Sequence, residues 1–237
     1  MNYINYYKNY ILAIIIICLC FFIYCHIYHL NKISTDLEIL QAEIPSNSKI
    51  QDLLVHKQPT IFRQVLYGWD VIIDIHEMPI EDIQNVILQD KQFVKLLHYY
   101  LSPYSLFLSY GWKYQITDRV IDNTQHHFYL ECHHRHIIAQ ITGQQRIYLA
   151  SPNQTEFLEP VVLSPNKELI NRKHNPVTFW NKEETSKEPF NKLQYIEIIL
   201  REGNILYIPR GWWYLQEVEE DGLVLEAVNK SVFNWIV

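Results

Sequence analysis

The chain has 237 residues, of which 20 are basic and 26 acidic, so its formal net charge is −6 at pH 7. A mildly acidic chain without basic runs does not suit sequence-independent nucleic-acid binding, which depends on clustered Lys and Arg side chains, so no nucleic-acid partner is expected. Apolar residues make up 49% and charged residues 19% of the composition, which excludes collagen-like, low-complexity and disordered chains.

The amino terminus carries a long uncharged segment. No Asp, Glu, Lys or Arg lies between Asn9 and Asn31, and residues 11–25 are almost wholly apolar. About 20 such residues in a helix match a hydrocarbon core about 30 Å thick. We therefore predict a membrane anchor over residues 1–33, with one transmembrane helix at residues 10–30 in contact with lipid. A cleaved signal peptide is less favoured because no small-x-small cleavage site follows, and the few flanking charges leave the membrane side open.

Residues 34–237 contain no second membrane-spanning run, repeat or flexible linker, which predicts a single domain. Capping residues predict short helices at about 37–40 and 50–55, strands are expected at 59–64 and 71–75, and apolar periodicity predicts a helix over 80–101. Short strands are then predicted at 105–110, 126–132, 137–142, 146–150, 195–200, 205–208, 213–218 and 223–228. Many short strands with few helices favour a mainly β sandwich or barrel.

Two stretches of the sequence indicate a particular fold more specifically than the composition does. Residues 136–152 read His-Ile-Ile-Ala-Gln-Ile-Thr-Gly-Gln-Gln-Arg-Ile-Tyr-Leu-Ala-Ser-Pro, and residues 202–214 read Glu-Gly-Asn-Ile-Leu-Tyr-Ile-Pro-Arg-Gly-Trp-Trp-Tyr. Together they resemble the cupin-like (JmjC-type) domain of the iron(II) and 2-oxoglutarate-dependent oxygenases. The resemblance implies a double-stranded β-helix with flanking helices, here preceded by the transmembrane helix.

The same resemblance implies an iron(II) site built from a His-x-Asp or His-x-Glu pair and a distal His. Counting back from Gly143, the first His falls on Leu130 and the carboxylate on Cys132, while the distal His falls on Tyr214. Leucine has no lone pair, and a phenol with a pKa near 10 is a poor ligand for ferrous iron. Glu131 lies between the first two positions, but strand alternation would turn it away from them.

No other register restores the metal site, because none of the 11 histidines is followed two positions later by Asp or Glu. The family's cosubstrate-binding lysine falls on Gln145, whose neutral amide cannot form a charge-assisted pair with 2-oxoglutarate. Only Asn229 matches a polar position of the family pocket. The sequence thus favours a pseudo-enzyme without a cofactor, which binds a protein or peptide partner or serves as a structural component.

In an alternative interpretation, the protein binds a metal ion at a different set of residues. If strand alternation holds, Cys132, His134 and His136 share a face directed into the barrel, where they would bind Zn(II) or Fe(II). Together with Tyr214, this rebuilt site would belong to a divergent oxygenase, similar to protein hydroxylases or demethylases, or to another metal-dependent enzyme. An irregular turn at this point would break the alternation, so both interpretations stay open.

Overall fold

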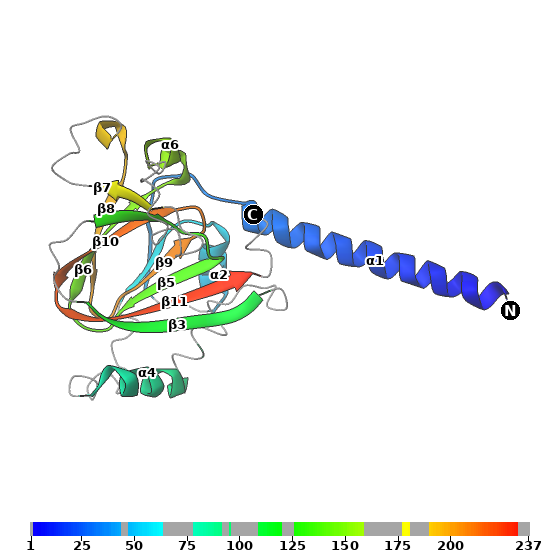
Figure 1. The fold of residues 1–237 in the computed structure, drawn as a ribbon, viewed down its shortest axis with the longest axis horizontal. Coiled ribbons are helices and arrows are strands. Elements are labelled where there is room, and N and C mark those ends of the chain that lie inside the picture. Colours follow the sequence, from blue (N-terminus) through cyan, green and yellow to red (C-terminus); the bar gives the residue numbers. More distant parts are fainter. Residues whose placement is uncertain are drawn as a thin grey trace, which may run out of the picture.

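The structure, a computed structural model, describes residues 2–43, 47–63, 78–91, 95, 109–119, 126–158, 177–180 and 190–231. Helix α1 (Asn2–Asn31) projects from a β-rich body (Figure 1). Its segment Tyr7–Tyr28 is long and apolar enough to cross a membrane. Most of the large apolar side chains along it are exposed, so the body of the protein does not bury this helix.

The body consists of short strands with a few helices. The elements in chain order are β1 (Leu40–Glu43), α2 (Asn47–Val55), β2 (Thr60–Arg63), α4 (Ile80–Gln89), β3 (Ser109–Arg119), β4 (His126–Leu130), β5 (Arg135–Gln140), β6 (Gln144–Ala150), η3 (Pro152–Gln154), α6 (Thr155–Leu158), β7 (Val177–Trp180), η6 (Phe190–Lys192), β8 (Ile196–Arg201), β9 (Ile205–Pro209), β10 (Trp213–Glu220) and β11 (Gly222–Ser231).

The strands form two sheets. One sheet has the order β1-β2-β9-β5-β11-β3 and the other β7-β4-β10-β6-β8. All pairs are antiparallel except β1 with β2. Strands β4 and β5, and later β9, β10 and β11, alternate between the two sheets, as in a double-stranded β-helix. The predicted mainly β fold is confirmed.

Three hydrophobic clusters follow from the alternation of side chains along the strands. The interior cluster lies between the sheets and contains Ile138 and Val224 from one sheet and Ile147 and Leu149 from the other. The helix-covered cluster joins the opposite face of the six-stranded sheet to α2 and α4. The outer cluster covers the opposite face of the five-stranded sheet, where Phe128 and Trp213 pack. A side chain's cluster therefore shows whether it points into the barrel.

Several element predictions need correction. Residues 37–39 form no helix, because the chain enters β1 at Leu40, whose N–H bonds to the carbonyl of Pro59. Helix α4 ends at Gln89, since Asp90 takes an extended conformation with ψ 121°. Strand β3 runs from Ser109 to Arg119, well past the predicted end at 110, and β7 was not predicted. The predicted strand at 71–75 and the end of the helix predicted to 101 lie outside the described residues.

Candidate functional site

The pairing of β4 with β10 decides which side chains point into the barrel. Tyr214 lies opposite Tyr129 and packs on the interior cluster, whereas Trp213 lies opposite Leu130 in the outer cluster. The Tyr129 and Tyr214 rings are 5.8 Å apart. Glu131 follows Tyr129 by two positions, and its backbone N–H bonds to the carbonyl of Trp212 at 2.8 Å, which extends the pairing. The interior face thus carries Tyr129, Glu131 and Tyr214.

Glu131 is 1% exposed and in contact with two imidazoles. Its Oε1 accepts the backbone N–H of His133 at 2.6 Å and lies 2.6 Å from the Nδ1 atom of that residue. Its Oε2 lies 2.6 Å from Nδ1 of His136. Burial raises the pKa of Glu131, but His136 and His133 outweigh burial and lower the pKa to about 2. Glu131 is therefore a carboxylate at neutral pH.

His136 connects this carboxylate to a phenol. It lies on β5, is buried, and its ring centroid is 5.3 Å from that of Tyr214 in an edge-to-face arrangement. We call Tyr129, Glu131, His133, His136 and Tyr214 the Glu131 cluster. A buried row of carboxylate, imidazole and phenol has the groups needed to hold and transfer a proton.

Leu130 and Cys132 are not interior residues, which corrects the expected register. Leu130 belongs to the outer cluster, and the half-buried thiol of Cys132 donates to the carbonyl of Leu130 at 3.5 Å. Burial and the charge of Glu131 raise the pKa of Cys132 to about 11, so the thiolate that metals prefer is disfavoured. The register shifts because residues 131–134, between β4 and β5, are not strand, so a count from Gly143 does not keep the alternation.

The irregular connection also separates the three residues of the alternative metal site. His134 is buried with its ring 6.0 Å from His26 of α1, whereas His136 contacts Glu131 and Tyr214. Burial, followed by the charges of Lys57 and other cations, lowers the pKa of His134 to about 2. Within the described ranges, no three His, Cys, Asp or Glu side chains are placed to share a metal ion.

The two predicted cosubstrate positions face different environments: Gln145 points into the barrel and Asn229 points away from it. Gln145 on β6 is buried on the same strand face as Ile147 and Leu149, so it points into the interior. Neither atom of its amide finds a hydrogen-bond partner in the described part of the chain. Asn229 lies opposite Trp112, a member of the helix-covered cluster, and so faces away from the interior. Of the two, only Gln145 points into the interior.

Comparison with known proteins agrees with this architecture. The family description "Cupin-like domain" matches residues 123–235. These residues form a cupin-like domain. The chain is similar to HSPB1-associated protein 1 of Homo sapiens, with 27% identity over 108 residues, which cover 46% of this chain and 20% of that protein. The protein of the same name from Rattus norvegicus gives 27% identity, with 46% and 21% covered. The chain thus spans about a fifth of the length of these relatives.

Among solved structures, the cupin-like domain is similar to the WlaRB TDP-quinovose 3,4-ketoisomerase from Campylobacter jejuni. That match has 11% identity and a TM-score of 0.30, and it covers 50% of this chain and 62% of the other. A likeness this distant carries no argument about chemistry.

The residues inside the cupin-like domain do not fit an iron(II) and 2-oxoglutarate site. A facial triad needs two imidazoles and one carboxylate with free lone pairs. At the three interior positions stand two phenols and Glu131, whose oxygens both contact imidazoles. Gln145 supplies no positive charge for a cosubstrate carboxylate. Glu131 is the one carboxylate among these three residues, and the sequence alone did not place it in the interior.

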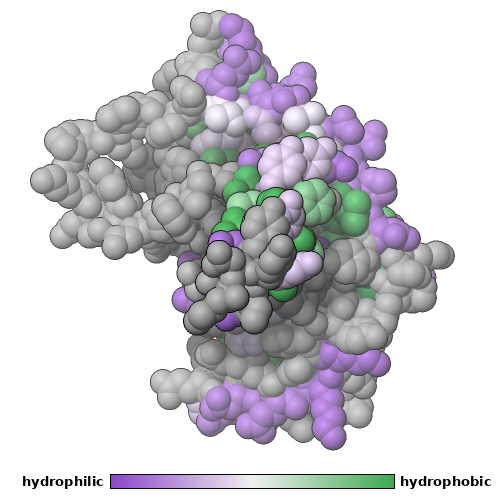
Figure 2. Space-filling view, turned by 90° about the vertical axis from the view of Figure 1, so that its right-hand side faces the viewer, coloured by the Kyte–Doolittle hydropathy of each residue, from purple (hydrophilic) through white to green (hydrophobic). Residues whose placement is uncertain are grey.

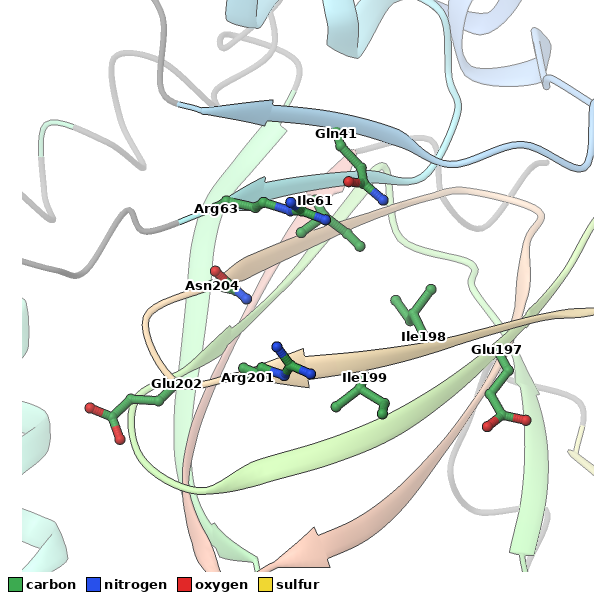
Figure 3. A pocket seen from close by; sticks show the side chains of 9 residues that line it. All are labelled: Gln41, Ile61, Arg63, Glu197, Ile198, Ile199, Arg201, Glu202 and Asn204. Atoms are coloured by element: carbon green, nitrogen blue, oxygen red, sulfur yellow. The ribbon is translucent and has the colours of Figure 1, made fainter.

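A separate groove opens between the edges of the two sheets (Figure 3). Its volume is about 490 Å³, and its walls come from β1 and β2 on one side and from β8 on the other. Arg63 and Arg201 line it from opposite walls, and none of its lining residues belongs to the Glu131 cluster. Among the strands that the structure describes, β1 and β8 lie at the edges of their sheets, and an edge strand has backbone groups on its outer side that can pair with a further strand.

Proposed function

We propose that this protein is a membrane-anchored cupin-like protein without iron(II) and 2-oxoglutarate oxygenase activity, which binds a protein or peptide partner or acts as a structural component. The observation that carries the proposal is the composition of the interior site. Tyr129 and Tyr214 stand beside Glu131, whose carboxylate is already engaged by His133 and His136. Phenols are poor ferrous ligands, so this set does not supply the donors that oxygen activation requires.

The anchor is α1, with residues 1–33 as the membrane segment and residues 34–237 as the domain outside the bilayer. Supporting this, the Tyr7–Tyr28 span has the length and composition of a transmembrane helix, and most of its apolar side chains are exposed. A helix of this kind is stable in water only when something covers it, and lipid is the environment that its uniform apolar surface suits.

The groove between β1–β2 and β8 is the proposed site for a partner peptide. An extended peptide can add a strand to an exposed sheet edge, with backbone hydrogen bonds for affinity and side-chain pockets for specificity. The relatives are named as HSPB1-associated, which is in keeping with a protein partner for this family. The groove offers both edge strands and two arginines to such a peptide.

The full chain, purified in a non-ionic detergent and supplied with Fe(II), ascorbate and 2-oxoglutarate, tests the absence of oxygenase chemistry. We expect no more succinate than a heat-denatured sample of the same protein produces. Succinate formed above the denatured control and abolished by Glu131→Ala would refute the proposal.

A second candidate is a metal-dependent enzyme with a rebuilt site, for which Glu131, His133 and His136 have the donor chemistry but, in the described part of the chain, not an arrangement that shares an ion. Elemental analysis of the purified full chain separates this candidate from the first. The metal-dependent candidate predicts that the purified chain contains a bound metal. His136→Ala should remove this metal, and Cys132→Ala should retain it, because Cys132 lies outside the Glu131 cluster. Equal metal content in the wild type and both variants would reject this site.

A further inference from the structure

The groove between β1–β2 and β8 lies beside an overhang of the six-stranded sheet. β8 is the last described strand of the five-stranded sheet, and the short turn at residues 202–204 connects it to β9 of the other sheet. The six-stranded sheet continues past β9 with β2 and β1. The inner face of these two strands therefore extends beyond β8, and the groove of about 490 Å³ occupies this place.

The position of the groove suits one further strand. In the described part of the chain β8 pairs with β6 alone, so its other edge faces the groove. A strand added to that edge would continue the five-stranded sheet and would cover the inner face of β1 and β2. Backbone hydrogen bonds to β8 would hold it in place, as in other complexes in which a peptide extends a sheet.

Isoleucines from both walls give the groove an apolar floor. Ile61 belongs to the interior cluster and Ile198 packs on it, whereas Ile199 points to the outer side of β8. Ile199 is 42% exposed. Edge strands are commonly protected by charged side chains, a bulge or a covering segment, so an exposed isoleucine on such a strand favours an occupant.

Two arginines provide positive charge in the groove. Arg63 ends β2 on the same strand face as Ile61, and Arg201 ends β8 on the same face as Ile199. Both arginines are exposed. No carboxylate in the described ranges forms an ion pair with either of them.

The two glutamates that line the groove are directed elsewhere. Oε1 of Glu197 lies 2.8 Å from Nη1 of Arg146, outside the groove. The side chain of Glu202 points away from Arg201 (Figure 3). A guanidinium forms its strongest hydrogen bonds with a carboxylate, so an acidic side chain of an occupant is the group that complements Arg63 and Arg201.

The arginines lie at the end of the barrel away from α1. The segment that follows α1 packs on Gly211, just past the end of β9, and apolar side chains gather near the middle of the face from which α1 projects (Figure 2). Arg63 and Arg201 lie instead beside the start of β9, at Ile205. An occupant that contacts them therefore comes from the aqueous side and not from the bilayer proposed around α1.

We propose that the occupant is an extended, acidic segment of a partner protein, which pairs with β8 as an added strand and binds Arg63 and Arg201 through Asp or Glu side chains. The inference rests on the partner site proposed above and names the class of partner. Side chains of an added strand alternate between the inner and the outer side, so a carboxylate on either side finds one of the two arginines.

Selection from a phage-displayed library of random seven-residue peptides tests the acidic class, with the full chain in a non-ionic detergent as the target. Arg63→Glu/Arg201→Glu is the groove variant. Lys91→Glu/Lys113→Glu is the control, because it changes the net charge equally at exposed lysines outside the groove. We expect Asp and Glu to be enriched roughly threefold or more over the unselected library on wild type and control, and Lys and Arg to replace them on the groove variant.

The same Asp and Glu content in peptides selected on the wild type and on the groove variant would overturn the proposal. So would peptides without an acidic excess on the wild type. If the wild type enriches no peptide that the groove variant loses, and light scattering shows a dimer that the groove variant does not form, the occupant is a second copy of this chain and the proposal is wrong.

Both double variants change exposed side chains, so their melting temperatures should equal that of the wild type. If the groove variant melts lower, Arg63→Gln and Arg201→Gln replace it. Each should then weaken binding of a selected acidic peptide roughly tenfold, since one charge-assisted contact is lost. Unchanged binding by both single variants would also overturn the proposal.

N-methylated copies of a selected peptide test the pairing with β8. A strand presents its backbone N–H groups alternately to its two edges, so methylating every second residue removes the hydrogen bonds of one edge only. One of the two alternating patterns should weaken binding roughly tenfold, and the other should weaken it much less, as measured by fluorescence anisotropy. Equal losses from both patterns would contradict an added strand.

A photo-crosslinking amino acid at Ile199 separates failure of the acidic class from failure of the partner site. Crosslinking of selected peptides that carry no acidic excess would refute only the acidic class. If no selected peptide crosslinks at this position, the groove as a partner site is refuted as well.

Discussion

Glu131 is the carboxylate at the centre of the Glu131 cluster. It is buried between His133 and His136, and its pKa is lowered because the imidazoles favour the charged form more strongly than burial disfavours it. A group whose folded-state pKa lies below its ordinary value stabilises the fold above the ordinary value. That contribution is lost as the pH falls toward the folded-state pKa.

We predict that acid weakens the barrel between about pH 4.5 and pH 2 as Glu131 becomes protonated, by on the order of 3 kcal/mol in total. Glu131→Gln should be less stable at pH 7 and should lack this part of the pH dependence. Urea unfolding of the detergent-solubilised chain, followed by the fluorescence of the buried Trp212 and Trp213, measures both effects. Parallel pH profiles for wild type and Glu131→Gln would contradict the assignment.

At the scale of residues, the sequence predicted which types of side chain lie in the interior. It predicted the wrong strand register for residues 129–132. It indicated that Tyr214 replaces a histidine and that Gln145 replaces a lysine, and both lie inside the barrel. It did not identify Tyr129 and Glu131 as interior residues, because the histidine that would mark the register is missing. One sequence signal could have identified them: Glu131 is a single acidic residue with histidines on both sides of it, at 126 and 127 and at 133, 134 and 136.

At the scale of elements, turns hold the two sheets together. The turn between β5 and β6 packs against the turn between β10 and β11, where Thr142 Oγ1 accepts the N–H of Leu223 at 3.0 Å. Gly143 has a φ of +72°, and a Cβ added there would lie 2.5 Å from the carbonyl oxygen of Asp221. Neither the conformation nor the space permits a side chain.

Gly143→Ala should therefore destabilise the barrel by about 1–3 kcal/mol, from a strained φ and a clash with backbone. Gln144→Ala, at the next position, is the matched control and should change the unfolding free energy by less than about 0.5 kcal/mol. Urea unfolding of the two variants beside the wild type gives the comparison. A neutral Gly143→Ala would show that this contact between turns is not rigid.

Element boundaries were predictable where the pattern is local. The strand from Ile205 and the turn at Gly143 follow from branched residues and glycine. The alternation of Trp112, Tyr114 and Ile116 with exposed neighbours marks β3, but it was cut short at Tyr110 in the prediction. β1 could not be predicted, since only pairing with β2, distant in sequence, makes residues 40–43 a strand.

At the scale of the whole molecule, the fold keeps three features apart. The apolar helix α1, the interior Glu131 cluster and the groove at the sheet edges share no residue. Substitutions inside the barrel need not affect the groove, because the groove is built from the strands at the sheet edges. The proposed partner site in the groove therefore does not depend on the chemistry of the barrel interior.

A photo-crosslinking amino acid at Ile199, which is 42% exposed in the groove, should capture a protein partner in membranes of cells that express the full chain. Val55, which is 49% exposed on α2 and not part of the groove, is the control position. The yield at position 199 should exceed that at position 55 and should fall when Arg63 and Arg201 are replaced by Ala. Equal yields at both positions would contradict a partner site in the groove.

The central claim is that the barrel lacks an iron site because phenols, Tyr129 and Tyr214, stand at the two interior positions where imidazole ligands are needed, while His133 and His136 engage the carboxylate of Glu131. The most direct test is an anaerobic titration of Fe(II) into the full chain, with the Tyr129→His/Tyr214→His double variant measured in parallel. We predict no saturable binding by the wild type and a gain of binding by the double variant, which places imidazoles at the two interior strand positions now held by phenols. Saturable binding of one Fe(II) per wild-type chain, abolished by Glu131→Ala, would contradict the claim.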